Sequence, residues 1–292
     1  GSAVYYILES VRFLRARNKT IAEHWLDTCA KVCDTALELQ REDGNLGYTY
    51  ETGRKAVRDW DGFAGCWLAA AMAVCYQLTG KECYLNGASK AQRYYKQFVA
   101  ALSCYGTPMD TWKAIDEEGN LAFIKLCRLL HQSTGIPEYL QDLQIGLDYE
   151  CNWRYAFAAK PEFAPLRDSG WNSCGGSITS VSNPHMHPMG LITIEDFDYY
   201  YRETGDVYYR QRADDSLAWV MNTLELYPDT VTCGQFGVLS ERYCPSDGLT
   251  IERNPDGSPA SVWFSYNGWA AASALEGLLQ YLCIYSSESN CK

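Results

Sequence analysis

The feature that most constrains the fold is an irregular repeat in which a helix ends at Thr-Gly and a second helix follows. The repeat occurs in YQLTGKECYLNGASKAQRYY (76–95), HQSTGIPEYLQDLQIGLDYE (131–150) and YRETGDVYYRQRADDSLAWV (201–220). A glycine supplies the left-handed cap that stops a helix. A tyrosine three or four residues past each glycine supplies the hydrophobic contact that closes a helical hairpin. Repeats of this kind predict stacked helical hairpins.

Hydrophobic periodicity places the helices along the chain. The expected helices span residues 3–17, 20–42, 61–79, 82–104, 114–134, 137–150, 188–204, 207–225 and 266–285. Helices 61–79 and 266–285 are apolar nearly all round and rich in Ala and Gly, so we expect both to be buried on every side. Helices 82–104 and 207–225 carry polar side chains on one face and should meet water.

An alternation of fully buried and half-buried helices is what two concentric layers of helices produce. We therefore expect an all-α fold, an α/α toroid of helical hairpins. A chain of 292 residues exceeds the usual single-core domain, but helical rings reach this size, so we expect one domain over residues 1–292. The opening Gly1-Ser2-Ala3 has the composition of a cloning remnant.

Charge and cysteine content exclude several classes of partner. The net charge of −11 argues against nucleic acid, because no basic stripe is present to neutralise a phosphate backbone. The 13 cysteines are odd in number, lie largely inside apolar helical runs and form no CxxC, which favours free thiols in a reducing cytoplasm. No apolar run of about 18 residues and no signal peptide is evident, so we expect no membrane partner.

The abundant aromatic side chains have two readings. The 22 tyrosines and 9 tryptophans could line a wet cleft in which sugar faces stack, or could fill an ordinary core. Long polar loops at 43–60, 105–113, 151–187 and 226–265 would rise on one rim of a toroid. A funnel lined by these loops would be floored by the N-termini of the inner helices, and loops on a rigid scaffold commonly carry function.

Three polar clusters stand at the expected starts of inner helices. VRDWDGF contains Arg58, Asp59, Trp60 and Asp61, and KAIDEEGNL contains Asp116. SNPHMHPMG contains Asn183, His185 and His187, and the prolines beside the histidines predict a rigid, non-helical loop. Capping is the alternative for each aspartate, because an N-cap Asp stabilises a helix by roughly 1 kcal/mol.

No metal or cofactor site is predicted. Two histidines need a third ligand to hold a metal, and none can be identified, so hydrogen bonding to a substrate or acid–base work is favoured. GxSxG is absent, and SCGGS (173–177) lacks the lysine and the strand-to-helix context of a phosphate loop.

Two segments resemble the unsaturated glucuronyl hydrolases and the related unsaturated rhamnogalacturonyl hydrolases. In AIDEEGNLAFIKLCRLLHQSTGIPEYLQDL, Asp116, Asn120 and Leu121 match the start of an inner helix whose aspartate is the catalytic acid/base of those families. WDGFAGCWLAAAMAVCYQLTGKECYL is similar to their His-Asp-x-Gly-Phe segment, with Asp61 at the second aspartate. Here Trp60 replaces the histidine, and Gly62 follows Asp61 directly.

The resemblance implies an (α/α)6 barrel with a carbohydrate site, in a bacterial, cytoplasmic enzyme of polysaccharide degradation. Two departures stand out. SNPHMHPMG occupies the place of a family Trp-x-Arg-Gly helix start that helps to hold the sugar carboxylate. About ten helices are present where about twelve are expected, so the ring closes differently or a partner chain or missing segment completes it.

The resulting hypothesis is a glycoside hydrolase that acts on a uronic-acid-containing oligosaccharide. Asp116 would protonate a 4,5-unsaturated uronic sugar, and Asp61 would position or polarise the reacting groups. With a saturated sugar, the pair would act as the general acid and base of an inverting hydrolysis. The side chains expected to bind the substrate are Arg58, Trp60, Trp112, Trp171, Asn183, His185 and His187. Glu117 and Glu118 should point into solvent or toward the helix N-terminus.

Two alternatives remain open. A toroidal polysaccharide lyase or sugar epimerase would use a His or Tyr as a base, and the histidine segment favours it. A non-catalytic α/α binding scaffold would instead have an apolar funnel without converging carboxylates.

Overall fold

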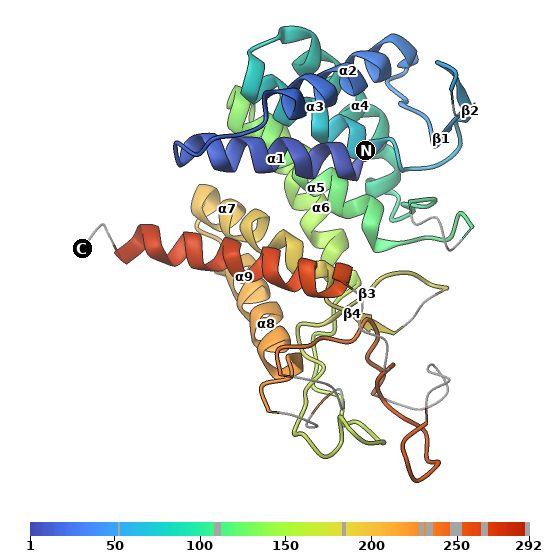
Figure 1. Ribbon diagram of the computed structural model, residues 1–292, viewed down its shortest axis with the longest axis vertical. Helices are drawn as coiled ribbons and strands as arrows, with labels where there is room; N and C mark the ends of the chain where they lie inside the picture. The colour runs from blue at the N-terminus through green and yellow to red at the C-terminus, as the bar shows by residue number, and fades with distance from the viewer. Residues whose placement is uncertain are drawn as a thin grey trace. The chain divides into compact units, whose positions relative to one another are not determined.

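The structure is a computed structural model that describes residues 1–51, 53–107, 112–182, 185–227, 231, 236–245, 253–263 and 268–289. The described chain is mainly helical, with two short two-stranded ribbons, which confirms the expected all-α class (Figure 1). The chain divides into two compact units, Gly1–Tyr149 and Glu150–Lys292. The expectation of a single domain over residues 1–292 stays a prediction.

The first unit is a set of helices arranged around one central helix. Its elements are α1 (Ser2–Ala16), α2 (Glu23–Leu39), β1 (Thr49–Tyr50), β2 (Val57–Asp59), α3 (Cys66–Thr79), α4 (Glu82–Ala100), α5 (Glu117–Thr134) and most of α6 (Pro137–Asn152). Helix α3 packs against α1, α2, α4 and α5. Strands β1 and β2 pair antiparallel and precede α3 in the chain.

Helix α3 is buried on every side, as its composition predicts. All side chains from Cys66 to Cys75 are buried. The alanines at 69, 70, 71 and 73 expose at most 1% of their surface. Small side chains on all faces let the surrounding helices approach, so this segment can have several neighbours at once.

Each Thr-Gly pair ends a helix in the way that the repeat predicts. Gly80, Gly135 and Gly205 have φ angles of 70°, 67° and 77°, and each caps the helix before it. The preceding threonine donates its hydroxyl to the carbonyl four residues back, at 2.7–2.8 Å. The same hydroxyl accepts the N–H two residues ahead, at 3.2–3.4 Å. The dipeptide therefore fixes both the end of one helix and the direction of the next.

The second unit holds the remaining elements. They are β3 (Ser177–Ile178), β4 (Met186–His187), the 3-10 helix η1 (Met189–Thr193), α7 (Ile194–Thr204), α8 (Val207–Thr223) and α9 (Gly268–Ser289). Strands β3 and β4 pair antiparallel, and α7 packs against both α8 and α9. None of the helices in the described residues is long and apolar enough to span a bilayer.

The expectation that helix 266–285 is buried on every side is wrong. Leu275, Leu279 and Leu282 of α9 expose 57%, 49% and 58% of their surface. Ala270 and Ala274 lie on a face that is buried. Composition sets how much of a helix can be buried, but the number of neighbours sets how much is buried. Here η1, α7 and α8 pack against α9 and leave these leucines uncovered.

The Thr-Gly caps generate a stability prediction. Gly135→Ala is expected to lower the free energy of unfolding by about 1–2 kcal/mol, because an L-residue is strained in the left-handed conformation. A Cβ at Gly135 meets no atom within 4 Å, so the loss would come from the backbone alone. Urea denaturation measures it. Gly135→Asn is the control and should cost less, since Asn tolerates this conformation; equal losses in both variants would contradict the explanation.

Candidate functional site

Three loop segments of the first unit meet at the start of α5. We call them the loop cluster; they comprise residues 59–65, 104–107 and 112–116. The amide of Phe63 donates to the Tyr105 carbonyl at 2.9 Å, and the amide of Asp116 donates to the Cys104 carbonyl at 3.0 Å. The amide of Gly106 donates to the Ala114 carbonyl at 3.2 Å. The structure therefore carries Asp61 and Asp116 on loops that are hydrogen-bonded to one another.

Asp116 is the N-cap of α5, so the capping alternative is confirmed for this residue. One carboxyl oxygen accepts the Gly119 amide at 3.0 Å and the other accepts the Thr107 amide at 3.2 Å. The side chain is fully buried, with 0% exposed. Burial raises the pKa of Asp116 to about 7, although the amide hydrogen bonds oppose the shift. A cap of this kind can hold or release a proton near neutral pH.

Glu117 is buried, so of the two directions expected for it, into solvent or toward the helix N-terminus, the first is wrong. Its exposed fraction is 0%, whereas Glu118 is half-buried. The first turn of α5 also packs against the loop cluster at Gly119. A Cβ at Gly119 would lie 2.6 Å from the Thr107 hydroxyl and 2.7 Å from the Phe63 ring, so this turn is closely covered.

Asp61 lies before α3 rather than at its first turn. The expected helix start at residue 61 is wrong, because α3 begins at Cys66 and Gly62 has a φ of 153°. The Asp61 side chain is 62% exposed, and its carboxylate is 2.8 Å from the ammonium of Lys113. The Tyr105 hydroxyl donates to its other oxygen. Lys113 first, and then Tyr105, hold the pKa of Asp61 below its usual value.

Lys113 also pairs with Asp59, at 2.9 Å. Neither Lys113 nor Tyr105 was identified from the sequence as a functional residue. A lone lysine and a lone tyrosine in loops match no motif, and their role depends on contacts with residues about 50 positions away. The one local signal was the Tyr105-Gly106 pair in the loop before α5, since Gly106 has a positive φ of 71°.

The remaining predicted residues of the first unit differ in exposure. Arg58 is exposed on β2, and because successive strand residues alternate in direction, it projects from the face opposite Asp59. Trp60 is half-buried, with the Arg41 guanidinium 5.3 Å from its ring. Trp112 is 80% exposed and offers an open ring face.

The second unit contains a stack of three aromatic rings. The centroids of His185 and His187 are 4.7 Å apart, and His187 lies 5.2 Å from Trp269. The expected loop is corrected here: His187 belongs to strand β4, and side chains two apart on a strand share a face. Within the described chain, Nε2 of His185 and both ring nitrogens of His187 have no hydrogen-bond partner.

Burial keeps both imidazoles neutral. Their exposed fractions are 3% and 4%. Burial first, and then the nearby Arg242, lowers the pKa of His185 to about 4. Burial, His185 and Arg242 lower the pKa of His187 well below its usual value. Across the residues that the structure describes, no three His, Cys, Asp or Glu side chains gather as a metal site.

Two other predicted residues of this unit have different outcomes. Trp171 is buried and its indole N–H donates to the Thr223 hydroxyl at 3.0 Å, so it belongs to the core and offers no open face to a sugar. Asn183 lies outside the described residues.

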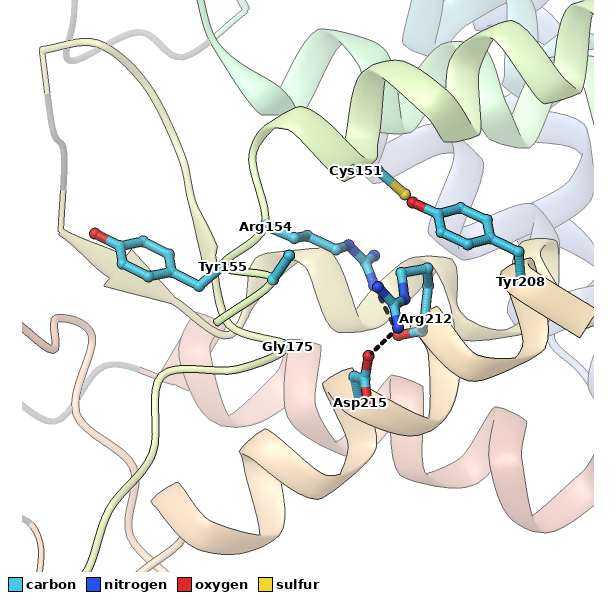
Figure 2. Close-up of a pocket in the computed structure, with 8 residues that line it drawn as sticks. Cys151, Arg154, Tyr155, Gly175, Tyr208, Arg212 and Asp215 are labelled. Carbon is cyan, nitrogen blue, oxygen red and sulfur yellow. Dashed lines mark hydrogen bonds and ion pairs between the residues drawn. The ribbon is translucent and has the colours of Figure 1, made fainter. Parts of the chain in front are cut away.

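A small cavity in the second unit is lined by paired side chains (Figure 2). It has a volume of about 30 Å³ and is lined by Cys151, Arg154, Tyr155, Ala156, Gly175, Tyr208, Arg212 and Asp215. Arg212 pairs with Asp215 at 2.7 Å, and the buried Arg154 pairs with Glu150 at 3.3 Å. The volume suits one or two water molecules and excludes a sugar ring.

Comparison with known proteins gives a fold but no family. No protein-family model and no curated protein matches the chain. It is similar to a GH76 α-mannanase from Bacteroides thetaiotaomicron, at 14% identity over 98% of this chain and 68% of that chain, with a TM-score of 0.57. It is also similar to a D-mannose isomerase, at 13% identity over 94% of this chain and 70% of that chain, with a TM-score of 0.57.

At these identities the likeness concerns the fold alone. Both proteins are α/α toroids, which confirms the fold class expected from the hairpin repeat. The narrower resemblance to the unsaturated uronyl hydrolases stays a prediction.

The pKa of Asp116 generates a prediction about pH and stability. The ordinary pKa of 3.8 applies to the unfolded chain, and the folded value is about 7. Between these values the folded state holds a proton that the unfolded state has released, so stability should fall as pH rises from about 4 to about 7. Asp116→Asn removes this proton and keeps an oxygen that can cap α5.

Urea denaturation at about pH 5 and about pH 8 measures the effect. The loss of stability between the two pH values should be smaller in Asp116→Asn than in the wild type. Asp206→Asn, at the exposed N-cap of α8, is the control for capping. An unchanged pH dependence in Asp116→Asn would show that Asp116 is already ionised at low pH.

Proposed function

We propose that this protein is a carbohydrate-active enzyme of the glycoside hydrolase type that acts on a uronic-acid-containing oligosaccharide. One observation carries the proposal. Two aspartates stand on hydrogen-bonded loops, and their environments move their pKa values in opposite directions. Asp116 can carry a proton near neutral pH while Asp61 remains a carboxylate, which is the division of roles that an acid-and-base pair requires.

The substrate class rests on two further considerations. The similar solved structures are named as a mannanase and a mannose isomerase, which favours a saccharide. The uronic acid comes from the resemblance of the segments around Asp61 and Asp116 to the uronyl hydrolases. Trp112, with its open ring face next to Lys113 in the chain, is suited to stack on a sugar.

In this reaction Asp116 donates its proton to C4 of the 4,5-double bond of the unsaturated sugar. Water then adds at C5 and returns a proton to the Asp116 carboxylate, while Asp61 accepts a hydrogen bond from that water and positions it. The C5 hydroxyl loses its proton as the bond from C5 to the ring oxygen breaks, which gives a C5 ketone and a hemiacetal at C1. The hemiacetal then releases the linked sugar as an alcohol, which breaks the glycosidic bond. Because the Asp116 carboxyl has no exposed surface, the substrate can reach it only if the groups that cover it move, and the Thr107 amide is one of the groups in contact with it.

The test uses an unsaturated uronyl disaccharide made by a polysaccharide lyase, with loss of ultraviolet absorbance as the readout. Asp116→Asn should lower kcat by about 100-fold or more, the range expected for loss of a general acid. Asp61→Asn should also lower it. Asp168→Asn is the control, because that exposed carboxylate belongs to the second unit and pairs with Arg167. Full activity in Asp116→Asn would contradict the assignment.

A substrate panel separates the hydrolase from its alternatives. Release of reducing sugar from an α-mannooligosaccharide, without loss of absorbance from the unsaturated disaccharide, would move the substrate to neutral saccharides. A gain of absorbance on an intact acidic polysaccharide would identify a lyase.

A second candidate function is proton abstraction by a histidine, as in a sugar epimerase or lyase. The observation that favours it is the neutral His185–His187 pair, in which Nε2 of His185 and both ring nitrogens of His187 lack partners in the described chain. A neutral imidazole can accept a proton from carbon next to a carbonyl or carboxylate.

This candidate predicts exchange of a sugar C–H proton with deuterated water, followed by ¹H NMR on mannose and on a uronic sugar. His187→Gln should lower the exchange rate by about 100-fold, and Asp116→Asn should leave it unchanged. His24→Gln, at an exposed histidine of the first unit, is the matched control. No exchange in the wild-type protein would exclude the candidate.

A further inference from the structure

The Lys113 side chain contacts several charged and aromatic groups, although it lies in a loop. Its ammonium lies 2.8 Å from Asp61 and 2.9 Å from Asp59, and its side chain is only 18% exposed. It also lies 5.3 Å from the centroid of the Tyr48 ring and 5.4 Å from that of Trp112. Two carboxylates and two aromatic faces therefore surround one cation, and all belong to the first unit.

The backbone of Lys113 is held in an unfavourable conformation. Its φ is 48°, in the left-handed region where an L-residue costs about 1–2 kcal/mol. Such conformations persist where surrounding contacts compensate for them, and they concentrate at functional sites. Here the compensation comes from the two carboxylates and the two rings.

The aromatic side of this arrangement is tied to the Asp61 loop. A Cβ at Gly62 would lie 2.7 Å from the Tyr48 ring, so the ring packs directly on the backbone that follows Asp61. The Tyr48 amide donates to the Asp59 carbonyl at 2.8 Å. Lys113 therefore contacts a tyrosine ring whose own residue is packed against, and hydrogen-bonded to, the segment that carries Asp59 and Asp61.

The other groups that face Asp61 do not replace the cation. Tyr105 donates one hydrogen bond, and the Asp61 amide donates to Asp59 at 2.9 Å, which keeps a second negative charge close by. Tyr94 of α4 lies near enough for its titration to be affected by Asp61. Among these groups Lys113 is the single positive charge, so without it two neighbouring carboxylates would repel each other.

We propose that Lys113 is a positioning residue that keeps Asp61 ionised and oriented, and so assigns the transferable proton of the aspartate pair to Asp116. The proposal rests on the proposed function of the pair and extends it. Lys113 acts through Asp61 and does not itself touch the reacting atoms. Without its charge, Asp61 takes up a proton at a higher pH, and its carboxylate is no longer held in one orientation.

The direct test is ¹³C NMR titration of aspartate carboxyl groups in the wild type, Lys113→Met and Lys113→Arg. In Lys113→Met the titration midpoint of Asp61 should rise by about one pH unit or more, the range for loss of an adjacent opposite charge. Lys113→Arg should retain most of the wild-type value, since it restores the charge. Lys55→Met, which removes an exposed lysine paired with Glu38 at 2.8 Å, is the control.

The kinetic test uses the unsaturated disaccharide. Lys113→Met should move the acidic limb of the pH–rate profile to higher pH and lower kcat about tenfold with little change in KM, because binding is not its role. If Lys113→Met does not fold, Lys113→Gln serves in its place. An Asp61 titration midpoint that is unchanged in Lys113→Met, or in Lys113→Gln where that variant is used, would overturn the proposal.

The two proposals fail in different ways. A wild-type protein that turns over no saccharide would refute the proposed function, while a raised Asp61 midpoint in Lys113→Met would still support the positioning role. An active wild type with the same pH–rate profile in Lys113→Met would overturn the positioning role and leave the hydrolase proposal standing.

Discussion

Burial of α3 on all sides is the constraint on which the first unit depends. A helix whose side chains from Cys66 to Cys75 are all buried needs neighbours on every face, and α1, α2, α4 and α5 supply them. Because α3 and α5 pack against each other, the loops that lead into them also meet. The backbone hydrogen bonds of Phe63 and Asp116 with the Tyr105 and Cys104 carbonyls join these loops. The candidate site is thus a consequence of how the central helices pack.

The acids at the start of α5 occupy two different environments. Asp116 offers an acceptor to the Gly119 amide at the buried start of α5 and to the Thr107 amide of the preceding loop, which explains its presence without any chemistry. The same position removes it from water, so its carboxyl retains a proton to a higher pH than usual. The capping role and the acid role that we propose would therefore both belong to this one side chain. Glu117, in the first turn of α5, is also buried, whereas Glu118 is half-buried.

The sequence predicted features that depend on local chemistry and missed those that depend on distant partners. The hairpins were predictable because a left-handed glycine and a following tyrosine are local signals, and the N-cap of α5 was predictable for the same reason. The exposed face of α9 was not predictable, because an all-apolar pattern does not show how many other helices pack against the helix. Lys113 was missed because its partners Asp59 and Asp61 are joined to it only by the fold. The pairing of Asp61 and Asp116 stays a functional prediction that the loop geometry supports.

The difference between the two aspartates follows from solvation rather than from residue type. Burial can raise a carboxyl pKa by several units, whereas an adjacent cation lowers it by about one to three. Asp116 has 0% of its surface exposed and receives two backbone amides, which offset only part of the desolvation. Asp61 is 62% exposed and has both water and Lys113 to stabilise its charge. A single proton available to this loop cluster near neutral pH therefore resides on Asp116, and the ionised partner is the one that a substrate or water can approach from solvent.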